Sequence, residues 1–260
     1  MNAKSKIKTS VYNEVIENLN KIEKENNVVI LQAIESGSRA WGFPSPDSDY
    51  DVRFIYAHQK DWYLQLNEER DVIELPINDE LDISGWDLRK ALSLANKGNA
   101  VIQEWMISPI VYRQSDSYTK LHELIGPAFN PIATYHHYRS MSKRAFFDIE
   151  NSNEKKLKRF FYFARATLSA KWVLEKQSMP SIVFSDLVHS LISDTKTINE
   201  IEGLVKQKAK ESEQSLLEVP SAIYHEFVGI FETLDERVAV DAPVPKIITN
   251  DGFRDLVLKK

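Results

Sequence analysis

An apolar run that ends in a loop of small residues is the feature that most constrains this chain. Residues 28–34 are apolar or β-branched apart from Gln32, and Ser36, Gly37 and Ser38 follow almost directly. Glycine lets the backbone approach a ligand closely, the Ser38 hydroxyl can donate to a phosphate oxygen, and N–H groups of the next helical turn would point the same way. The segment therefore predicts a strand that delivers a phosphate-binding loop.

Two aspartates follow Ser38 after a gap of ten residues. Asp49 and Asp51 alternate with apolar side chains over residues 50–56, so both carboxylates should emerge on one face of a strand. Carboxylates held together repel each other unless a cation lies between them, and hard oxygen ligands beside phosphates favour Mg²⁺. This pair therefore indicates a metal site.

A third carboxylate is expected from a neighbouring strand over residues 80–86. Asp82 is the candidate, because it alternates with apolar residues there, although Glu74, Asp79 and Glu80 lie close by in the sequence. In a two-metal site one ion holds the triphosphate and the other lowers the pKa of an attacking hydroxyl, and a third carboxylate serves that second ion or acts as base.

This glycine-serine pair, with its spacing to an Asp-x-Asp strand, resembles the signature of the DNA polymerase β-like nucleotidyltransferase superfamily. The longer motifs over residues 37–42 and 48–53, together with residues 87–105, look like the bacterial and phage predicted nucleotidyltransferases, some associated with RNA repair. The resemblance implies transfer of a nucleoside monophosphate from an NTP, most simply ATP, to a hydroxyl. It also implies Mg²⁺ or Mn²⁺ on Asp49, Asp51 and Asp82, and phosphates on Gly37 and Ser38.

Further cationic side chains could contact the triphosphate. Arg39 follows the serine and Arg53 shares the face of the two aspartates, so either could bind phosphate, or only balance acidic neighbours. On a predicted helix, Lys158, Tyr162 and Arg165 fall at i, i+4 and i+7 and form one stripe opposite a buried one. This stripe could bind the nucleotide, or be an ordinary helix face.

Composition excludes several classes of protein. The 260 residues carry a formal net charge of −5, which argues against indiscriminate binding to nucleic acid, and contain no cysteine, which excludes disulfides, thiolate catalysis and Cys-ligated zinc. His136 and His137 are adjacent, so on a helix they diverge and would not readily share an ion. No apolar run reaches about 18 residues and the first ten lack a signal-peptide core, so we expect a cytoplasmic protein without a membrane partner.

The periodicity predicts an α+β protein whose organisation changes near residue 115. A catalytic domain over 1–115 should be a mixed sheet flanked by helices, and a helical domain over 116–260 should be a bundle of five or six helices that closes the nucleotide cleft. Residues 241–246 read as an extended strap before a last short helix. The expected elements are helices at 9–26, 87–97 and 100–107 and strands at 28–35, 50–57, 71–76, 80–86 and 110–113.

Three functions compete for this architecture. The acceptor hydroxyl could belong to an RNA or tRNA end, or else to a protein side chain, as in antitoxin-like adenylylation, or to a small molecule such as an antibiotic. A non-catalytic nucleotide-binding module is the third, and the complete metal pair argues against it. The net charge weakly favours a protein or small-molecule acceptor and the resemblance weakly favours RNA.

Overall fold

The computed structural model describes residues 7–67, 69–76, 80–152, 156–212, 218–234 and 244–257. The chain divides into two compact units. Unit 1 comprises residues 1–40, 49–129 and 245–260, and unit 2 comprises residues 41–48 and 130–244. Each unit is therefore assembled from segments that are distant in the sequence.

Unit 1 is built on a five-stranded mixed sheet with the order β3-β4-β2-β1-β5. The strands β2 and β4 run parallel, whereas β1 pairs antiparallel with β2 and β5, and β3 pairs antiparallel with β4. The predicted α+β class is thus confirmed. The strands are β1 (Val28–Glu35), β2 (Tyr50–His58), β3 (Val72–Glu74), β4 (Leu81–Asp87) and β5 (Val111–Gln114).

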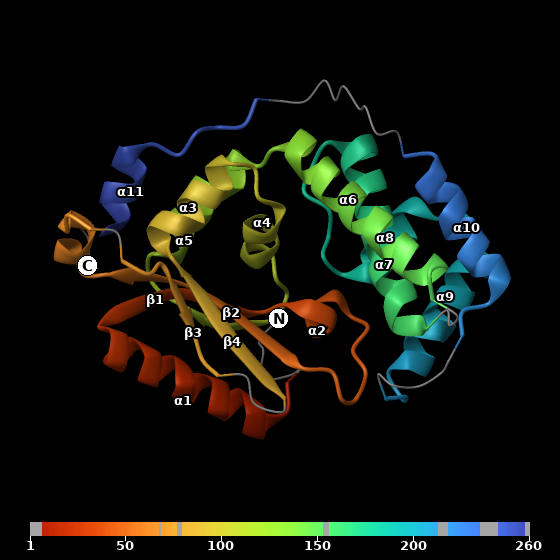
Figure 1. Ribbon diagram of the computed structural model, residues 1–260, viewed down its shortest axis with the longest axis horizontal. Helices are drawn as coiled ribbons and strands as arrows, with labels where there is room; N and C mark the ends of the chain where they lie inside the picture. The colour runs from red at the N-terminus through yellow and green to blue at the C-terminus, as the bar shows by residue number, and fades with distance from the viewer. Residues whose placement is uncertain are drawn as a thin grey trace. The chain divides into compact units, whose positions relative to one another are not determined.

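Helices cover both faces of this sheet (Figure 1). On one face α1 (Thr9–Asn26) buries Val15 and Leu19 against the alternate residues Val52 and Phe54 of β2. On the other face Ile55 of β2 packs in a separate apolar cluster with the remaining helices. These are α3 (Leu88–Asn96), α4 (Ala100–Met106), α5 (Tyr118–Ile125) and α11 (Asn250–Val257), with short 3₁₀ turns η2 (Lys60–Leu64) and η3 (Gly126–Ala128).

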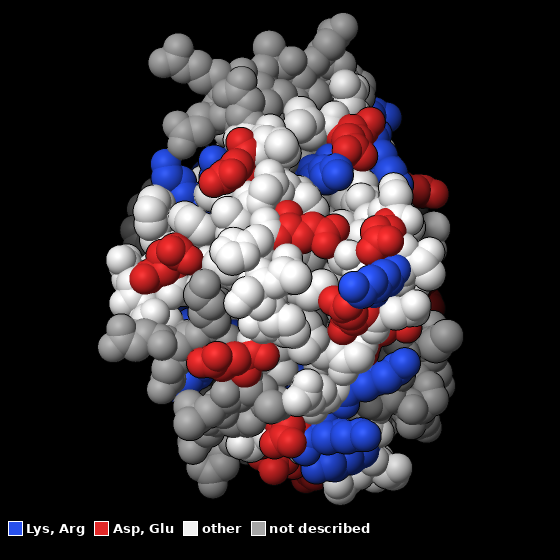
Figure 2. Space-filling model, turned by 90° about the vertical axis from the view of Figure 1, so that its right-hand side faces the viewer, with Lys and Arg blue, Asp and Glu red and all other residues white. Residues whose placement is uncertain are grey.

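Unit 2 is a helical bundle with an aromatic core. Phe160, Phe161 and Phe163 of one helix lie in the same buried cluster as Phe184 and Phe227. The face seen in Figure 2 carries acidic and basic side chains interspersed, with uncharged surface between them. The described helices of this unit are α6 (Pro131–Glu150), α7 (Leu157–Lys176), α8 (Phe184–Leu191), α9 (Thr195–Lys208) and α10 (Ser221–Glu232).

The strands and helices predicted in the first half lie where expected, with ends shifted by one or two residues, and β3 is shorter than the predicted 71–76. The domain boundary differs more. It falls at 129/130 rather than near 115, because Leu121 and Ile125 of α5 pack in the cluster on the sheet. Residues 245–257 also return to unit 1, where Ile248 and Asn96 exchange two hydrogen bonds.

The expected strap over 241–246 is described only from residue 244, where the chain has no regular structure before α11, and residues 241–243 lie outside the described part. Within that part, no helix has the length and apolar character needed to span a membrane.

Candidate active site

The loop after β1 is pressed against the first residues of β2. The backbone N–H of Ser36 donates to the carbonyl of Asp51 at 2.8 Å, and Gly37 then takes a positive φ of 60° at the start of the short helix α2 (Gly37–Trp41). A Cβ on Gly37 would lie 1.9 Å from Oδ2 of Asp51. Only glycine fits this approach. Ser38 follows and is 7% exposed, so the loop and the carboxylate form one compact structure.

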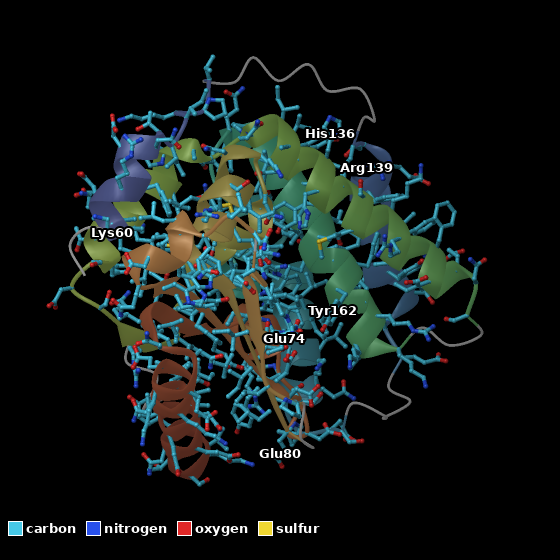
Figure 3. The ribbon with its side chains drawn as sticks, turned by 60° about the vertical axis from the view of Figure 1, so that its left-hand side comes forward. Lys60, Glu74, Glu80, His136, Arg139 and Tyr162 are labelled. Atoms are coloured by element: carbon cyan, nitrogen blue, oxygen red, sulfur yellow. The ribbon has the colours of Figure 1, made fainter. Side chains whose placement is uncertain are left out.

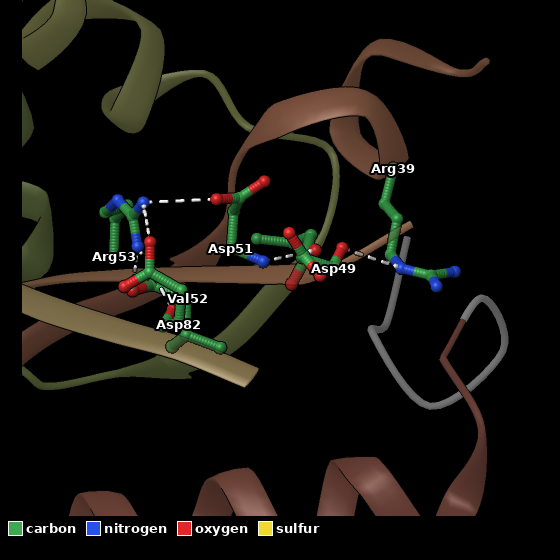
Figure 4. Close-up of polar contacts among 7 residues, drawn as sticks. Arg39, Asp49, Asp51, Val52, Arg53 and Asp82 are labelled. Atoms are coloured by element: carbon green, nitrogen blue, oxygen red, sulfur yellow. Dashed lines mark hydrogen bonds and ion pairs between the residues drawn. The ribbon is translucent and has the colours of Figure 1, made fainter. Parts of the chain in front are cut away.

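Two of the predicted carboxylates are register partners. Asp51 of β2 pairs with Asp82 of the parallel strand β4, and each side chain is a little over one quarter exposed. Arg53 lies with them on the same face of β2 and its Nη2 donates to Oδ1 of Asp51 at 3.1 Å and to Oδ2 of Asp82 at 2.7 Å (Figure 4). Its Nη1 donates to the carbonyls of Val52 and Asp82. Arg53 therefore offsets the repulsion between the two carboxylates.

The remaining predicted carboxylate, Asp49, lies just before β2 and is exposed. Its backbone carbonyl accepts a hydrogen bond from Nε of Arg39 at 3.1 Å (Figure 4). The Arg39 guanidinium also lies 3.8 Å from the ring centroid of Tyr50. These contacts hold the Arg39 side chain beside the first residue of β2. Arg39 itself follows Gly37 by two residues in the sequence.

Other acidic residues near Asp82 in the sequence are placed differently. Glu74 lies on β3, pairs with Arg70 at 2.6 Å and is in register with Ser84 rather than with Asp51. Glu80 is exposed just ahead of β4, at one end of the sheet in Figure 3. Asp79 lies outside the described residues. Among the described candidates, Asp82 is the register partner of Asp51.

Glu35 is a buried carboxylate that the sequence analysis missed, and it forms a hydrogen bond with the backbone of Asp51. Glu35 ends β1, is 0% exposed, and accepts hydrogen bonds from the Asp51 backbone N–H at 3.1 Å and from the Tyr112 hydroxyl at 2.6 Å. Burial raises the pKa of Glu35 to about 7, although both hydrogen bonds favour its ionised form. The sequence did contain a signal for Glu35, because an acidic residue ends the apolar strand just before Ser36.

The donor set is suited to a hard cation. Across the described residues, no three acidic or histidine side chains already converge as a metal cage, and the Arg53 guanidinium lies between Asp51 and Asp82 instead. Carboxylate oxygens are nevertheless the ligands that Mg²⁺ prefers, and two of them share one cationic nitrogen here. The residues at this end of β2 and β4 thus fit a divalent cation.

The structure places the three predicted residues of unit 2 in two different environments, two of them exposed and one buried. Lys158 and Tyr162 of α7 are exposed and line a cavity of about 640 Å³ between α6 and α7. Arg165 is 2% exposed, its Nε donates to the carbonyl of Ile182, and its guanidinium lies 4.2 Å from the Trp41 ring. Arg165 therefore packs against Trp41 inside unit 2 and does not continue an exposed stripe.

The geometry thus brings Gly37, Asp51, Arg53 and Asp82 into direct proximity in unit 1, with Asp49 and Arg39 joined beside them. This strand-loop-helix, which delivers a glycine and a serine against acidic residues, is the arrangement that the sequence resemblance leads us to expect. The chain belongs to the RNA repair pathway DNA polymerase beta family, which it matches over residues 11–243. This membership supports a nucleotidyl-transfer role and makes the protein a transferase.

Two individual proteins are similar to this chain. The uncharacterized protein YcgL of Bacillus subtilis (strain 168) is 42% identical over 243 residues, which cover 93% of this chain and 92% of YcgL. A nucleotidyltransferase-like protein from Exiguobacterium sibiricum 255-15 has 14% identity and a TM-score of 0.35. The match covers 84% of this chain and 74% of the Exiguobacterium chain. The second similarity is too low to bear on the site.

Proposed function

We propose that the protein transfers a nucleoside monophosphate from an NTP to the terminal hydroxyl of an RNA, using divalent cations held by Asp49, Asp51 and Asp82. The observation that carries this proposal is the pairing of Asp51 with Asp82 on parallel strands while Gly37 packs against Asp51. That arrangement puts the Gly37 loop beside a pair of carboxylates.

The loop residues bind and orient the triphosphate. Gly37 leaves room for the Asp51 carboxylate against the loop, Ser38 donates its hydroxyl to a phosphate oxygen, and Arg39, held by the carbonyl of Asp49, neutralises phosphate charge. In unit 2, Lys158 and Tyr162 supply a cation and an aromatic ring that suit nucleotide binding.

Mg²⁺ or Mn²⁺ held by the three aspartates would supply charge neutralisation for the triphosphate and a lowered pKa for the attacking hydroxyl. Glu35 fixes the backbone of Asp51 by accepting its N–H. Arg53 holds Asp51 and Asp82 in place through two charge-assisted hydrogen bonds. Both residues thereby preorganise the acidic edge.

The acceptor is assigned to RNA because the matching family is described by an RNA repair pathway. ATP is the expected nucleotide. The test is incubation of the purified protein with each α-labelled NTP and Mg²⁺ or Mn²⁺, offering total RNA, a tRNA pool and cell-lysate protein as acceptors. The Asp49→Asn Asp51→Asn double variant is the control.

Label that enters RNA and requires the aspartates would support the proposal. Label that enters protein with the same requirement would replace the acceptor while keeping the chemistry. An absence of transfer to all acceptors, together with metal-dependent NTP binding by calorimetry, would indicate a nucleotide-binding module, and transfer that survives in the double variant would refute the assigned site.

A further inference from the structure

A cationic groove in unit 1 lies away from the aspartates. It has a volume of about 760 Å³ and is formed by η2, α3 and α11 together with the residues that precede α11. In Figure 1 these elements lie together at one end of the sheet. We call this the α3–α11 groove. The side chains that the argument uses are Lys60, Leu64, Arg89, Leu92, Lys97 and Arg254.

The charge of this groove is of one sign. Lys60, Arg89, Lys97 and Arg254 are exposed and line it, and the described lining contains no aspartate or glutamate. Arg254 pairs with Asp251 outside the lining, whereas Lys60 and Lys97 make no ion pair with any described residue. In a protein with a net charge of −5, this concentration of cations selects an anionic ligand.

Arg89 is held in a fixed position. Its Nη2 donates to the carbonyl of Tyr63 at 3.0 Å, and its guanidinium lies 5.0 Å from the Tyr63 ring centroid and 5.9 Å from that of Phe253. A guanidinium restrained by aromatic rings loses little entropy when it binds phosphate. The 72% exposed side chain of Leu64 adds an apolar surface at the rim, which suits a nucleobase or sugar.

The groove shares a sheet face with the predicted catalytic carboxylates. Leu92 and Val257, which line it, belong to the apolar cluster that contains Ile55 of β2. Ile55 alternates with the α1-facing residues of β2 and so points to the same side as Asp51 and Arg53. The carboxylates and the groove therefore lie on one face.

The carboxylates and the α3–α11 groove lie at opposite ends of that sheet face. Asp51 and Asp82 are near the starts of two parallel strands, whereas η2 follows the end of β2 and α3 follows the end of β4. Seven strand residues at about 3.3 Å each separate them by roughly 23 Å. In Figure 3, Lys60 and Glu80, which precedes β4, lie well apart. One small ligand cannot occupy both places.

The spacing of the cations favours a strand over a mononucleotide. Arg89 and Lys97 are eight residues apart along α3, or about 12 Å at 1.5 Å per residue. Successive phosphates of a stacked strand advance by about 3.4 Å, so this distance covers three or four phosphate steps.

We infer that the α3–α11 groove binds the phosphate backbone of the acceptor RNA, about seven nucleotides from the reacting end at about 3.4 Å per nucleotide. This inference rests on the proposed function, since it assumes that the end of the RNA lies at the aspartates and assigns the rest of the strand to the groove. The groove would then supply affinity and register without touching the reacting atoms.

The test is binding of a 15-nucleotide RNA that carries a 5′ fluorophore and a 3′-phosphate, so that its terminal 3′-hydroxyl is blocked. Anisotropy is measured with the full-length protein in EDTA over a range of salt concentrations. Lys60→Ala Lys97→Ala is compared with Lys21→Ala Lys24→Ala, which removes two exposed lysines of α1 from the opposite sheet face. Circular dichroism checks folding, and calorimetry measures ATP binding with Mg²⁺ in all three proteins.

The groove variant should bind the RNA roughly tenfold more weakly near 0.1 M salt and reduce the slope of log K against log salt by about 1.4, the loss of two phosphate contacts. The α1 variant should change neither quantity, and ATP binding should be equal throughout. Equal effects of the two double variants, or no effect of either, would overturn the inference.

Failure of the proposed function has a different signature. A wild-type protein that binds ATP but not the RNA would overturn the groove and the RNA acceptor while leaving nucleotidyl transfer. RNA binding that depends on Lys60 and Lys97, in a protein that binds no NTP, would support the groove and refute the proposed transferase site.

Discussion

Gly37 and Asp51 approach so closely that a Cβ on the glycine would lie 1.9 Å from Oδ2 of the aspartate. Gly37→Ala should therefore displace the carboxylate, abolish transfer and lower stability by about 1 to 2 kcal/mol through its positive φ. The matched control is Gly42→Ala, because Gly42 also has a positive φ but its Cβ would meet only Val183 at 3.6 Å. Transfer assays and thermal melts of both variants check this, and equal activity of the two would contradict it.

The aspartates should be needed for transfer and not for folding. Asp49→Asn and Asp51→Asn should each abolish transfer of label from an α-labelled NTP. Thermal stability should stay within about 1 kcal/mol, because Arg53 keeps Asp82 as partner and partly exposed ion pairs contribute little. Glu17→Gln, at an exposed position of α1, is the control for loss of one carboxylate. An Asp51→Asn protein with full activity would remove Asp51 from the site.

Much of the fold and the core of the site follow from local sequence patterns. The apolar run before Ser36, the alternation around Asp51 and the alternation around Asp82 each predicted a strand that the structure contains. Alternation is a local property, so it needs no knowledge of tertiary contacts. Asp82 was the candidate because it alternates with apolar residues on a predicted neighbouring strand, and the strand register pairs it with Asp51.

The features that the sequence analysis missed or left open depend on contacts between distant segments. The position of Arg53 between two carboxylates requires the parallel pairing of β2 with β4. The burial of Arg165 follows from its packing on Trp41, which lies more than a hundred residues earlier. The helical period alone placed Arg165 on the same stripe as Lys158, because periodicity says which residues share a face and not what covers it.

Arg53 should stabilise the metal-free protein. Arg53→Ala leaves Asp51 and Asp82 to repel each other, so the free energy of unfolding should fall by about 1 to 2 kcal/mol without metal. A divalent cation would replace the lost charge, so the increase in Tm with Mg²⁺ should be larger than in the wild type. Arg70→Ala, which breaks an exposed pair with Glu74, is the control. The same Mg²⁺ increment in wild type and Arg53→Ala would show that the ion does not bind between these carboxylates.

His58, the last residue of β2, should make the stability of the protein depend on pH. Its ring stacks on Trp62 at a centroid distance of 3.9 Å, and within the described structure its Nε2 is buried without a hydrogen-bond partner. Burial lowers the pKa of His58 to about 4, below the ordinary value of 6.5. Between these values the unfolded chain binds the proton more readily than the folded one, so stability is complete above pH 6.5 and is lost as pH falls toward 4.

Denaturant unfolding at pH 7 and pH 4.5 checks this. The wild type should lose on the order of 1 kcal/mol more than His58→Gln over this interval, a value reduced for the partial exposure of the ring. His225→Gln, at an exposed position of α10, is the control and should behave as the wild type. If His58→Gln and the wild type lose the same stability between these pH values, the low pKa of His58 is not linked to folding.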